Sequence, residues 1–124
     1  MDKSKILKLF GRCYNSGNFN NIEPLFSNGV KYEAFDCMYI VTSVPEVKKV
    51  LDDSRRKSTG AYEGFYIRKG ILFEKLIKCV IICDDNSLKS VRIVDVKPKR
   101  GRIVSITGYD PAEYKHTRGK RIIG

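Results

Sequence analysis

The feature that most constrains the fold is the order of elements in the first third of the chain, which reads as helix, turn, short helix and strand. Four apolar residues have the i, i+3, i+4, i+7 spacing of one buried helix face: Ile6, Leu9, Phe10 and Cys13. Gly17 suits the end of this helix, and Asn18 suits the start of a second one. The apolar stripe of the second helix is Phe19, Ile22, Leu25 and Phe26. Asn28 and Gly29 then turn the chain into a strand at 30–35, so this region indicates an architecture rather than a reaction.

A third helix and a series of strands are predicted for the rest of the chain. Ser43 and Glu46 form a capping box, and Pro45 suits the first turn of the helix that follows. Further strands are expected at 61–68, 71–83, 88–97 and 102–109. Three helices followed by long antiparallel strands predict an α+β domain at residues 1–110, with a basic tail at 111–124.

The predicted strand at 71–83 is apolar on both of its faces. Ile71 and Phe73 begin one face, and Leu72 begins the other. Because apolar faces are usually covered, we expect both sides of this strand to be partly buried.

Composition limits the class of protein. The chain has 124 residues, of which 42% are hydrophobic, so it can bury one domain-sized core. No apolar run reaches the roughly 18 residues that a membrane span needs. The N-terminus also lacks the apolar segment of a signal peptide. We therefore expect a cytoplasmic protein with no membrane partner.

The cysteines fit a reducing compartment. They are Cys13, Cys37, Cys79 and Cys83. None forms a C-x-x-C pair, and with a single histidine the sequence has no zinc-site spacing. Cys79 and Cys83 would lie about 13 Å apart on one strand, which is too far for a disulfide. Glycine-rich phosphate loops and His-Glu metal motifs are also missing from the sequence. We expect reduced thiols, no metal and no cofactor.

The formal net charge of +10 raises nucleic acid or an acidic protein surface as a partner. The first cluster of cations is Lys97, Lys99, Arg100 and Arg102. The second cluster is Lys115, Arg118, Lys120 and Arg121. A solvated hairpin tip and a disordered tail also account for these clusters. Proteins that stack nucleic-acid bases interleave aromatics with such charges, but only Tyr114 lies beside them here, so no motif supports this partner.

Three short motifs occur in the chain in a recognisable order. The turn at 14–22, YNSGNFNNI, is followed at 25–30 by LFSNGV and at 101–106 by GRIVSI. They resemble the Gly-containing turn, the step into the first strand and the final strand of the NTF2-like superfamily, which includes SnoaL-like and ketosteroid-isomerase-like proteins. The order of elements is similar to that of the family over 5–109.

This resemblance implies a cystatin-like cone in which three N-terminal helices pack on a curved, mainly antiparallel sheet. It also implies a homodimer formed through the sheet and a cavity at the open end of the cone. The candidate cavity residues are Phe10, Tyr14, Tyr32, Asp36, Tyr62, Tyr66 and Arg92. Ordinary core and cross-strand packing accounts for the tyrosines as well. The resemblance thus favours binding of a small molecule, with Arg92 as a contact for an anionic one.

The resemblance does not extend to isomerase catalysis. The family's isomerases place a carboxylate base at the end of the first strand, where this chain has Ala34. They place a tyrosine on the first helix, where this chain has Phe10. Their protonated aspartic acid falls near Ile93 or Val94. We therefore expect no ketosteroid-isomerase chemistry and assign no catalytic residue.

Two other carboxylates leave an enzymatic alternative open. Asp36 follows the first strand, near the expected mouth of the cone, and Asp95 lies within an apolar strand. A general base must come within hydrogen-bond reach of its proton, so this alternative requires one of them to face the cavity. A position on the surface would leave them no catalytic role.

Overall fold

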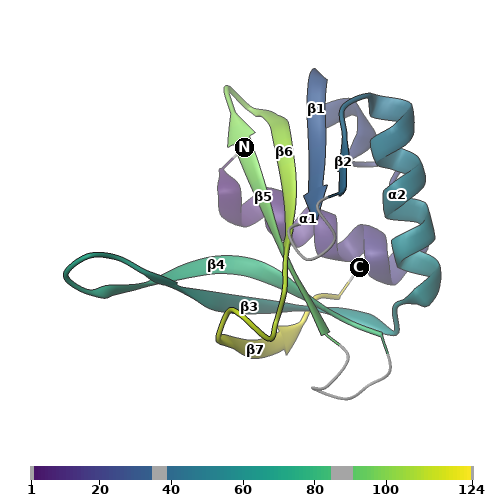
Figure 1. The fold of residues 1–124 in the computed structure, drawn as a ribbon. Helices are drawn as coiled ribbons and strands as arrows, with labels where there is room; N and C mark the ends of the chain where they lie inside the picture. The colour runs from purple at the N-terminus through teal and green to yellow at the C-terminus, as the bar shows by residue number, and fades with distance from the viewer. Residues whose placement is uncertain (1, 35–38, 85–90, 124) are drawn as a thin grey trace.

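The protein is built on one curved sheet, shown in Figure 1. The computed structural model describes residues 2–34, 39–84 and 91–123. Within them the strands are β1 (Phe26–Ala34), β2 (Tyr39–Val41), β3 (Gly60–Lys69), β4 (Glu74–Cys83), β5 (Val91–Lys99), β6 (Arg102–Tyr109) and β7 (His116–Arg121). They lie in the order β2-β1-β6-β5-β4-β3-β7, and only β1 and β6 pair in parallel. The α+β class and the curved, mainly antiparallel sheet are therefore confirmed.

Two α-helices, α1 (Lys3–Ser16) and α2 (Val44–Lys57), are present in the described residues. Gly17 ends α1 in the left-handed conformation, with φ 99°, as its position in the sequence predicts. Ser43 begins α2, because its hydroxyl oxygen accepts from the backbone N–H of Glu46 at 3.3 Å. The Ser43 hydroxyl also donates to the Glu46 carboxylate at 2.8 Å, so the predicted N-cap at Ser43 is confirmed and Glu46 contacts it through its side chain.

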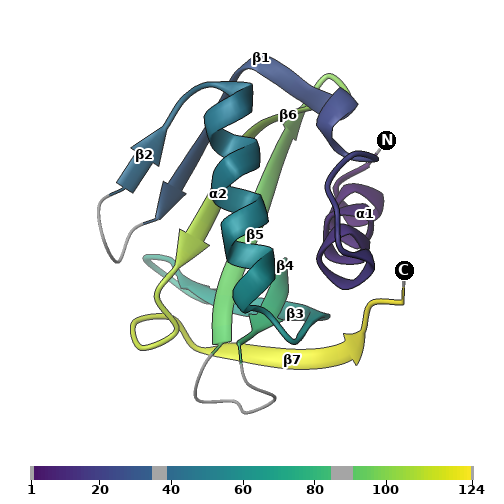
Figure 2. The same cartoon turned by 90° about the vertical axis from the view of Figure 1, so that its right-hand side faces the viewer.

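Both helices pack against the same face of the sheet, as Figure 2 shows. Three aromatic rings, those of Phe10, Tyr14 and Phe19, fill the centre of this core with ring centroids 5.1–5.7 Å apart. Val47 and Leu51 of α2 are fully buried beside them. The sheet contributes Val30, Val80, Val94, Val96 and Ile106. Burial of this face of the sheet holds the two helices in place.

The expected second helix is shorter than the sequence analysis predicts. Only a single 3-10 turn, η1 (Glu23–Leu25), forms there, so two α-helices replace the expected three. Phe19 and Ile22 are nevertheless fully buried, as their apolar stripe requires. Few residues separate Gly17 from the start of β1, and so short a segment closes too few hydrogen bonds to form a stable α-helix.

The basic tail expected at 111–124 contains an edge strand of the sheet. Strand β7 pairs with β3, with Tyr66 opposite His116. Beyond β7, the backbone carbonyl of Ile122 accepts a hydrogen bond from the side-chain amide of Asn15 in α1. The side chain of Ile122 is buried. The ordered core therefore continues past residue 110, and the description of this segment as a disordered tail is wrong over His116–Arg121.

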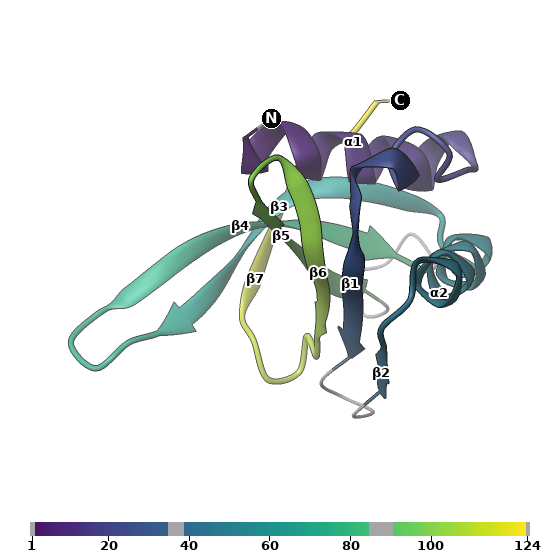
Figure 3. The same ribbon diagram turned by 90° about the horizontal axis from the view of Figure 1, so that it is seen from above.

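The β3–β4 hairpin differs most from its prediction. The strand expected at 71–83 begins only at Glu74, and a turn over 70–73 precedes it. In this turn the backbone N–H of Gly70 donates to the carbonyl of Phe73 at 3.1 Å. Figure 3 shows that the end of the hairpin projects beyond the rest of the molecule. Both faces of the strand are buried over residues 79–83, as expected, but residues 71–76 at the hairpin end are exposed.

Three of the four cysteines are free and buried, and Cys37 lies outside the described residues. Burial raises the pKa of the Cys13 thiol to about 11 and that of Cys79 to about 12. Only thiolates react with iodoacetamide, so at about pH 8 we expect labelling of both cysteines to be at least about 100-fold slower in the native protein than in urea. Peptide mapping by mass spectrometry reads each cysteine separately. Equal rates in the two states would contradict the burial.

Candidate functional site

A cavity opens between α2 and the sheet at the end of the molecule where Arg92 lies. We call it the α2 cavity, and its volume is about 340 Å³. Helix α2 contributes Val50, Asp53, Ser54 and Lys57, whose spacing places them on one helix face. The sheet contributes Tyr32, Ala34, Arg92, Val94, Gly108 and Tyr109. The lining thus combines apolar residues with a few polar ones, which is the usual composition of a small-molecule pocket.

Arg92 is the most firmly held polar group of the cavity. Its Nε and Nη2 donate to the Asp84 carboxylate at 3.1 and 2.5 Å. Its Nη2 also donates to the carbonyl of Ser54 at 3.1 Å, and its Nη1 donates to the Ser54 hydroxyl. These bonds connect β5 with α2 and fix the guanidinium in one orientation.

The network continues from Ser54 into the core. The hydroxyls of Ser54 and Tyr14 lie 2.9 Å apart and form a hydrogen bond. Burial raises the pKa of Tyr14 far above its ordinary value, so its hydroxyl is neutral at physiological pH. Through this hydrogen bond Tyr14 holds Ser54, which lines the cavity, from the core side.

The structure brings together some of the predicted cavity residues and separates others. Tyr32 and Arg92 line the α2 cavity, while Tyr14 and Phe10 lie in the core behind it. Asp36 lies outside the described residues. Sequence reasoning missed Ser54 and Lys57, although their spacing from Val50 on a capped helix could have indicated them.

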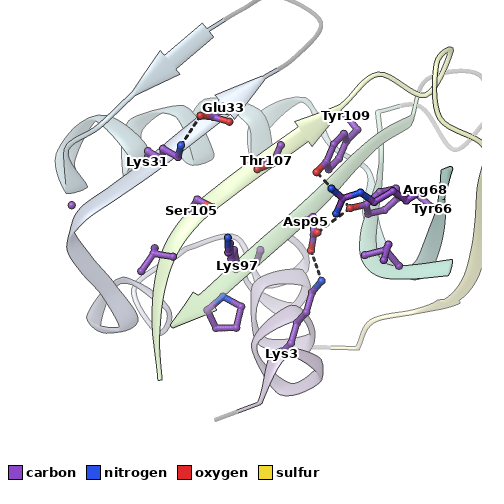
Figure 4. A pocket seen from close by; sticks show the side chains of 15 residues that line it. Lys3, Lys31, Glu33, Tyr66, Arg68, Asp95, Lys97, Ser105, Thr107 and Tyr109 are labelled. Atoms are coloured by element: carbon purple, nitrogen blue, oxygen red, sulfur yellow. Dashed lines mark hydrogen bonds and ion pairs between the residues drawn. The ribbon is translucent and has the colours of Figure 1, made fainter. Parts of the chain in front are cut away.

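The predicted tyrosines Tyr62 and Tyr66 lie on the opposite face of the sheet, together with a second hollow. This outer cleft has a volume of about 620 Å³ and lies across β1, β5 and β6 (Figure 4). The side chains along β5 alternate, so Val94 and Val96 enter the core while Asp95 faces the cleft. The expected grouping of all the tyrosines around one cavity is therefore wrong.

Asp95 is the central acidic group of the outer cleft. Its side chain is 17% exposed and forms an ion pair with Lys3 at 2.9 Å. The hydroxyl of Tyr66 donates to it at 3.2 Å, and the Tyr66 ring stacks on Tyr109 with centroids 4.8 Å apart. Burial, together with the bonds to Tyr109 and Asp95, raises the pKa of Tyr66 far above its ordinary value. Asp95 is thus held on the far side of the sheet from the α2 cavity.

The two predicted basic clusters lie on different strands of the sheet. The cluster at 97–102 occupies the β5–β6 hairpin tip, whereas the second lies on and beside β7 (Figures 1 and 2). Part of the second cluster is engaged within the molecule, because Arg118 lies 4.5 Å from the centre of the Tyr62 ring and Arg121 donates to the carbonyl of Thr59.

Comparisons with known proteins concern the fold. No family model matches the sequence, and no curated protein matches it. A solved NTF2-like protein of unknown function from Burkholderia xenovorans has 12% identity and a TM-score of 0.62, over 86% of this chain and 80% of that one. This chain has the NTF2-like fold. A de novo designed protein with a curved β-sheet matches 90% of both chains, with 18% identity and a TM-score of 0.60.

A further solved structure, from Catenulispora acidiphila, is of a hypothetical protein with a ketosteroid isomerase-like fold in complex with trimethylamine. It shares 9% identity and a TM-score of 0.57 with this chain, over 88% of this chain and 87% of that one. The positions that the resemblance assigns to isomerase catalysis are apolar here. Ala34 and Val94 line the α2 cavity, and Phe10 lies in the core.

Further properties of the residues that the structure describes concern metal binding, membrane spans and acidic groups. No three His, Cys, Asp or Glu side chains among them gather closely enough to hold a metal ion. None of the described helices combines the length and the apolar character needed to cross a bilayer. Asp53 is the one described carboxylate that lines the α2 cavity, and it pairs with Arg56 at 3.3 Å.

Proposed function

We propose that the protein binds a small anionic molecule, such as a carboxylate, in the α2 cavity. The observation that carries this proposal is the fixed Arg92 guanidinium that lines the cavity, with Lys57 of α2 as a second cationic lining residue. A donor that is already held in place loses little conformational entropy when a ligand binds. Tyr32 adds a phenolic hydroxyl to the same wall.

The rest of the lining supports a ligand with a compact apolar body. Ala34, Val50, Val94 and Gly108 provide apolar surface beside the cationic groups. A volume of about 340 Å³ is near the lower end of known ligand pockets, so the ligand is small. No catalytic step is part of the proposal.

The test combines native mass spectrometry with calorimetry. Gently purified protein should carry a small extra mass compared with its denatured form, and a panel of aliphatic and aromatic monocarboxylates should include binders. Because a charged hydrogen bond contributes about 1.5–3 kcal/mol, we expect Arg92→Gln to weaken binding by about tenfold or more. Lys57→Gln should weaken it by a few-fold without affecting folding, because Lys57 is exposed.

Lys49→Gln is the matched control, since Lys49 is an exposed lysine of α2 that does not line the cavity. It should leave the affinity unchanged. A protein with no adduct and no binding to any member of the panel would contradict the proposal. Equal losses from Lys57→Gln and Lys49→Gln would assign the effect to net charge instead.

Two other expectations stay predictions. The homodimer formed through the sheet is read from the same native mass spectrum as the ligand. Binding of nucleic acid or an acidic protein is the alternative function. It would show an affinity that falls steeply with salt.

A further inference from the structure

The end of the β3–β4 hairpin carries an apolar tip that nothing in the described residues covers. We define the tip as Ile71, Leu72 and Phe73, which are 103%, 87% and 75% exposed. Leu76, near the start of strand β4, is also 60% exposed. The central positions of tight turns normally hold polar residues or glycine, so consecutive apolar side chains there call for a physical reason.

Cations surround this tip on both strands. Arg68 and Lys69 end β3, and Lys75 lies at the start of β4. All three are exposed. Glu74 is the one carboxylate between residues 68 and 76. An apolar end ringed by cations is complementary to a surface that is anionic outside and apolar inside.

We propose that the apolar tip inserts into an anionic lipid bilayer, with Arg68, Lys69 and Lys75 against the headgroups. Three successive residues of the tip are exposed, so apolar side chains point in several directions rather than along one face. A fluid bilayer can surround such a tip, whereas a groove on a protein would contact only one side of it. A second copy of this chain fits less well, because it would bring two tips and two molecules of charge +10 together. Cations beside inserted apolar residues are the usual basis of peripheral membrane binding.

This inference departs from the expectation of no membrane partner. That expectation rests on the lack of a membrane-spanning segment, and peripheral insertion of a hairpin needs none. The hairpin end projects away from the two helices in Figures 1 and 3, so insertion would leave the α2 cavity open. The membrane contact and the proposed ligand site therefore stand or fall separately.

The first test is co-sedimentation with vesicles. Wild-type protein should bind phosphatidylcholine vesicles that contain about 30% phosphatidylserine and should not bind pure phosphatidylcholine. The variant Ile71→Ser/Leu72→Ser/Phe73→Ser should lose at least about tenfold in binding, since it removes the inserted apolar surface. Lys69→Gln/Lys75→Gln should lose about fivefold for each charge removed. The matched charge control is Lys99→Gln/Arg100→Gln at the β5–β6 tip, which should bind as the wild type does.

The second test uses the lack of tryptophan in the chain. Phe73→Trp creates a single reporter whose fluorescence should shift to the blue with anionic vesicles, whereas Phe65→Trp, near the middle of β3, should not shift. Light scattering of the wild type and the triple serine variant shows whether the tip joins two copies. The proposal would be overturned if wild-type protein did not bind anionic vesicles, or if both tryptophan reporters shifted equally. It would also be overturned if the wild type were a dimer and the triple serine variant a monomer.

Discussion

Phe10→Ala is expected to lower the free energy of unfolding by about 4 kcal/mol, the largest effect of any single substitution considered for this chain. Phe10 is fully buried in α1, and its ring contacts those of Tyr14 and Phe19 at centroid distances of 5.3 and 5.7 Å. Alanine leaves a cavity at the point where α1 meets the sheet, and rigid strands cannot close it. Urea unfolding followed by circular dichroism measures the change.

The matched control is Phe65→Ala, the same substitution on the sheet at a residue that is 41% exposed. We expect it to cost about 1 kcal/mol or less, because two fifths of this side chain stays in water after folding, whereas all of Phe10 is removed from it. Similar losses at both positions would mean that the aromatic cluster is not the centre of the core. The slope of unfolding against urea should stay the same for both variants, since neither changes the area exposed on unfolding by much.

The sequence predicted the elements that local chemistry controls. Gly17 ends α1 and Ser43 begins α2 at the positions that these residue types predict, because helix ends depend on groups a few residues away. The short apolar stripe at Phe19 predicted burial correctly but not the helix type. The segment is too short for an α-helix, because the hydrogen bonds of a single turn do not offset the conformational entropy lost in helix nucleation.

Strand β7 could not be predicted in the same way, because its support comes from distant residues. His116–Arg121 is polar and basic, as a solvated tail would be. It is held by pairing with β3 and by the hydrogen bond from Asn15 to the carbonyl of Ile122. Only the apolar pair Ile122 and Ile123, at the end of a basic run, distinguishes this segment from a disordered tail.

Only some residues of the candidate site could be predicted from the sequence. Arg92 and Tyr32 were predicted because the resemblance placed their strands, and both line the α2 cavity. Tyr66 was assigned to the same cavity but faces the outer cleft, because a strand presents alternate residues to opposite faces. Which face a side chain takes depends on register, and one sequence does not reveal the register of β3 against its neighbours.

The second large loss of stability is expected at the contact between β3 and the edge strand β7, which the sequence analysis did not predict. Gly64→Ala is expected to lower the free energy of unfolding by about 2 kcal/mol. A Cβ atom at this position would lie 2.3 Å from Cγ1 of Ile81 and 2.6 Å from the backbone carbonyl oxygen of Thr117. The carbonyl belongs to β7, so β7 must move away from β3 to make room. Urea unfolding measures the loss, and trypsin should cut after Arg118 and Lys120 faster than in the wild type.

Gly29→Ala is the matched control, because it is also a glycine in a strand, and nothing lies within 4 Å of the Cβ it would add. Its stability should be unchanged or raised by about 0.5 kcal/mol, since alanine restricts the unfolded chain. If Gly64→Ala is as stable and as slowly cut as Gly29→Ala, then β7 does not lie against β3. If it is destabilised and cut faster, a segment with the composition of a tail is part of the sheet because glycine lets another backbone approach.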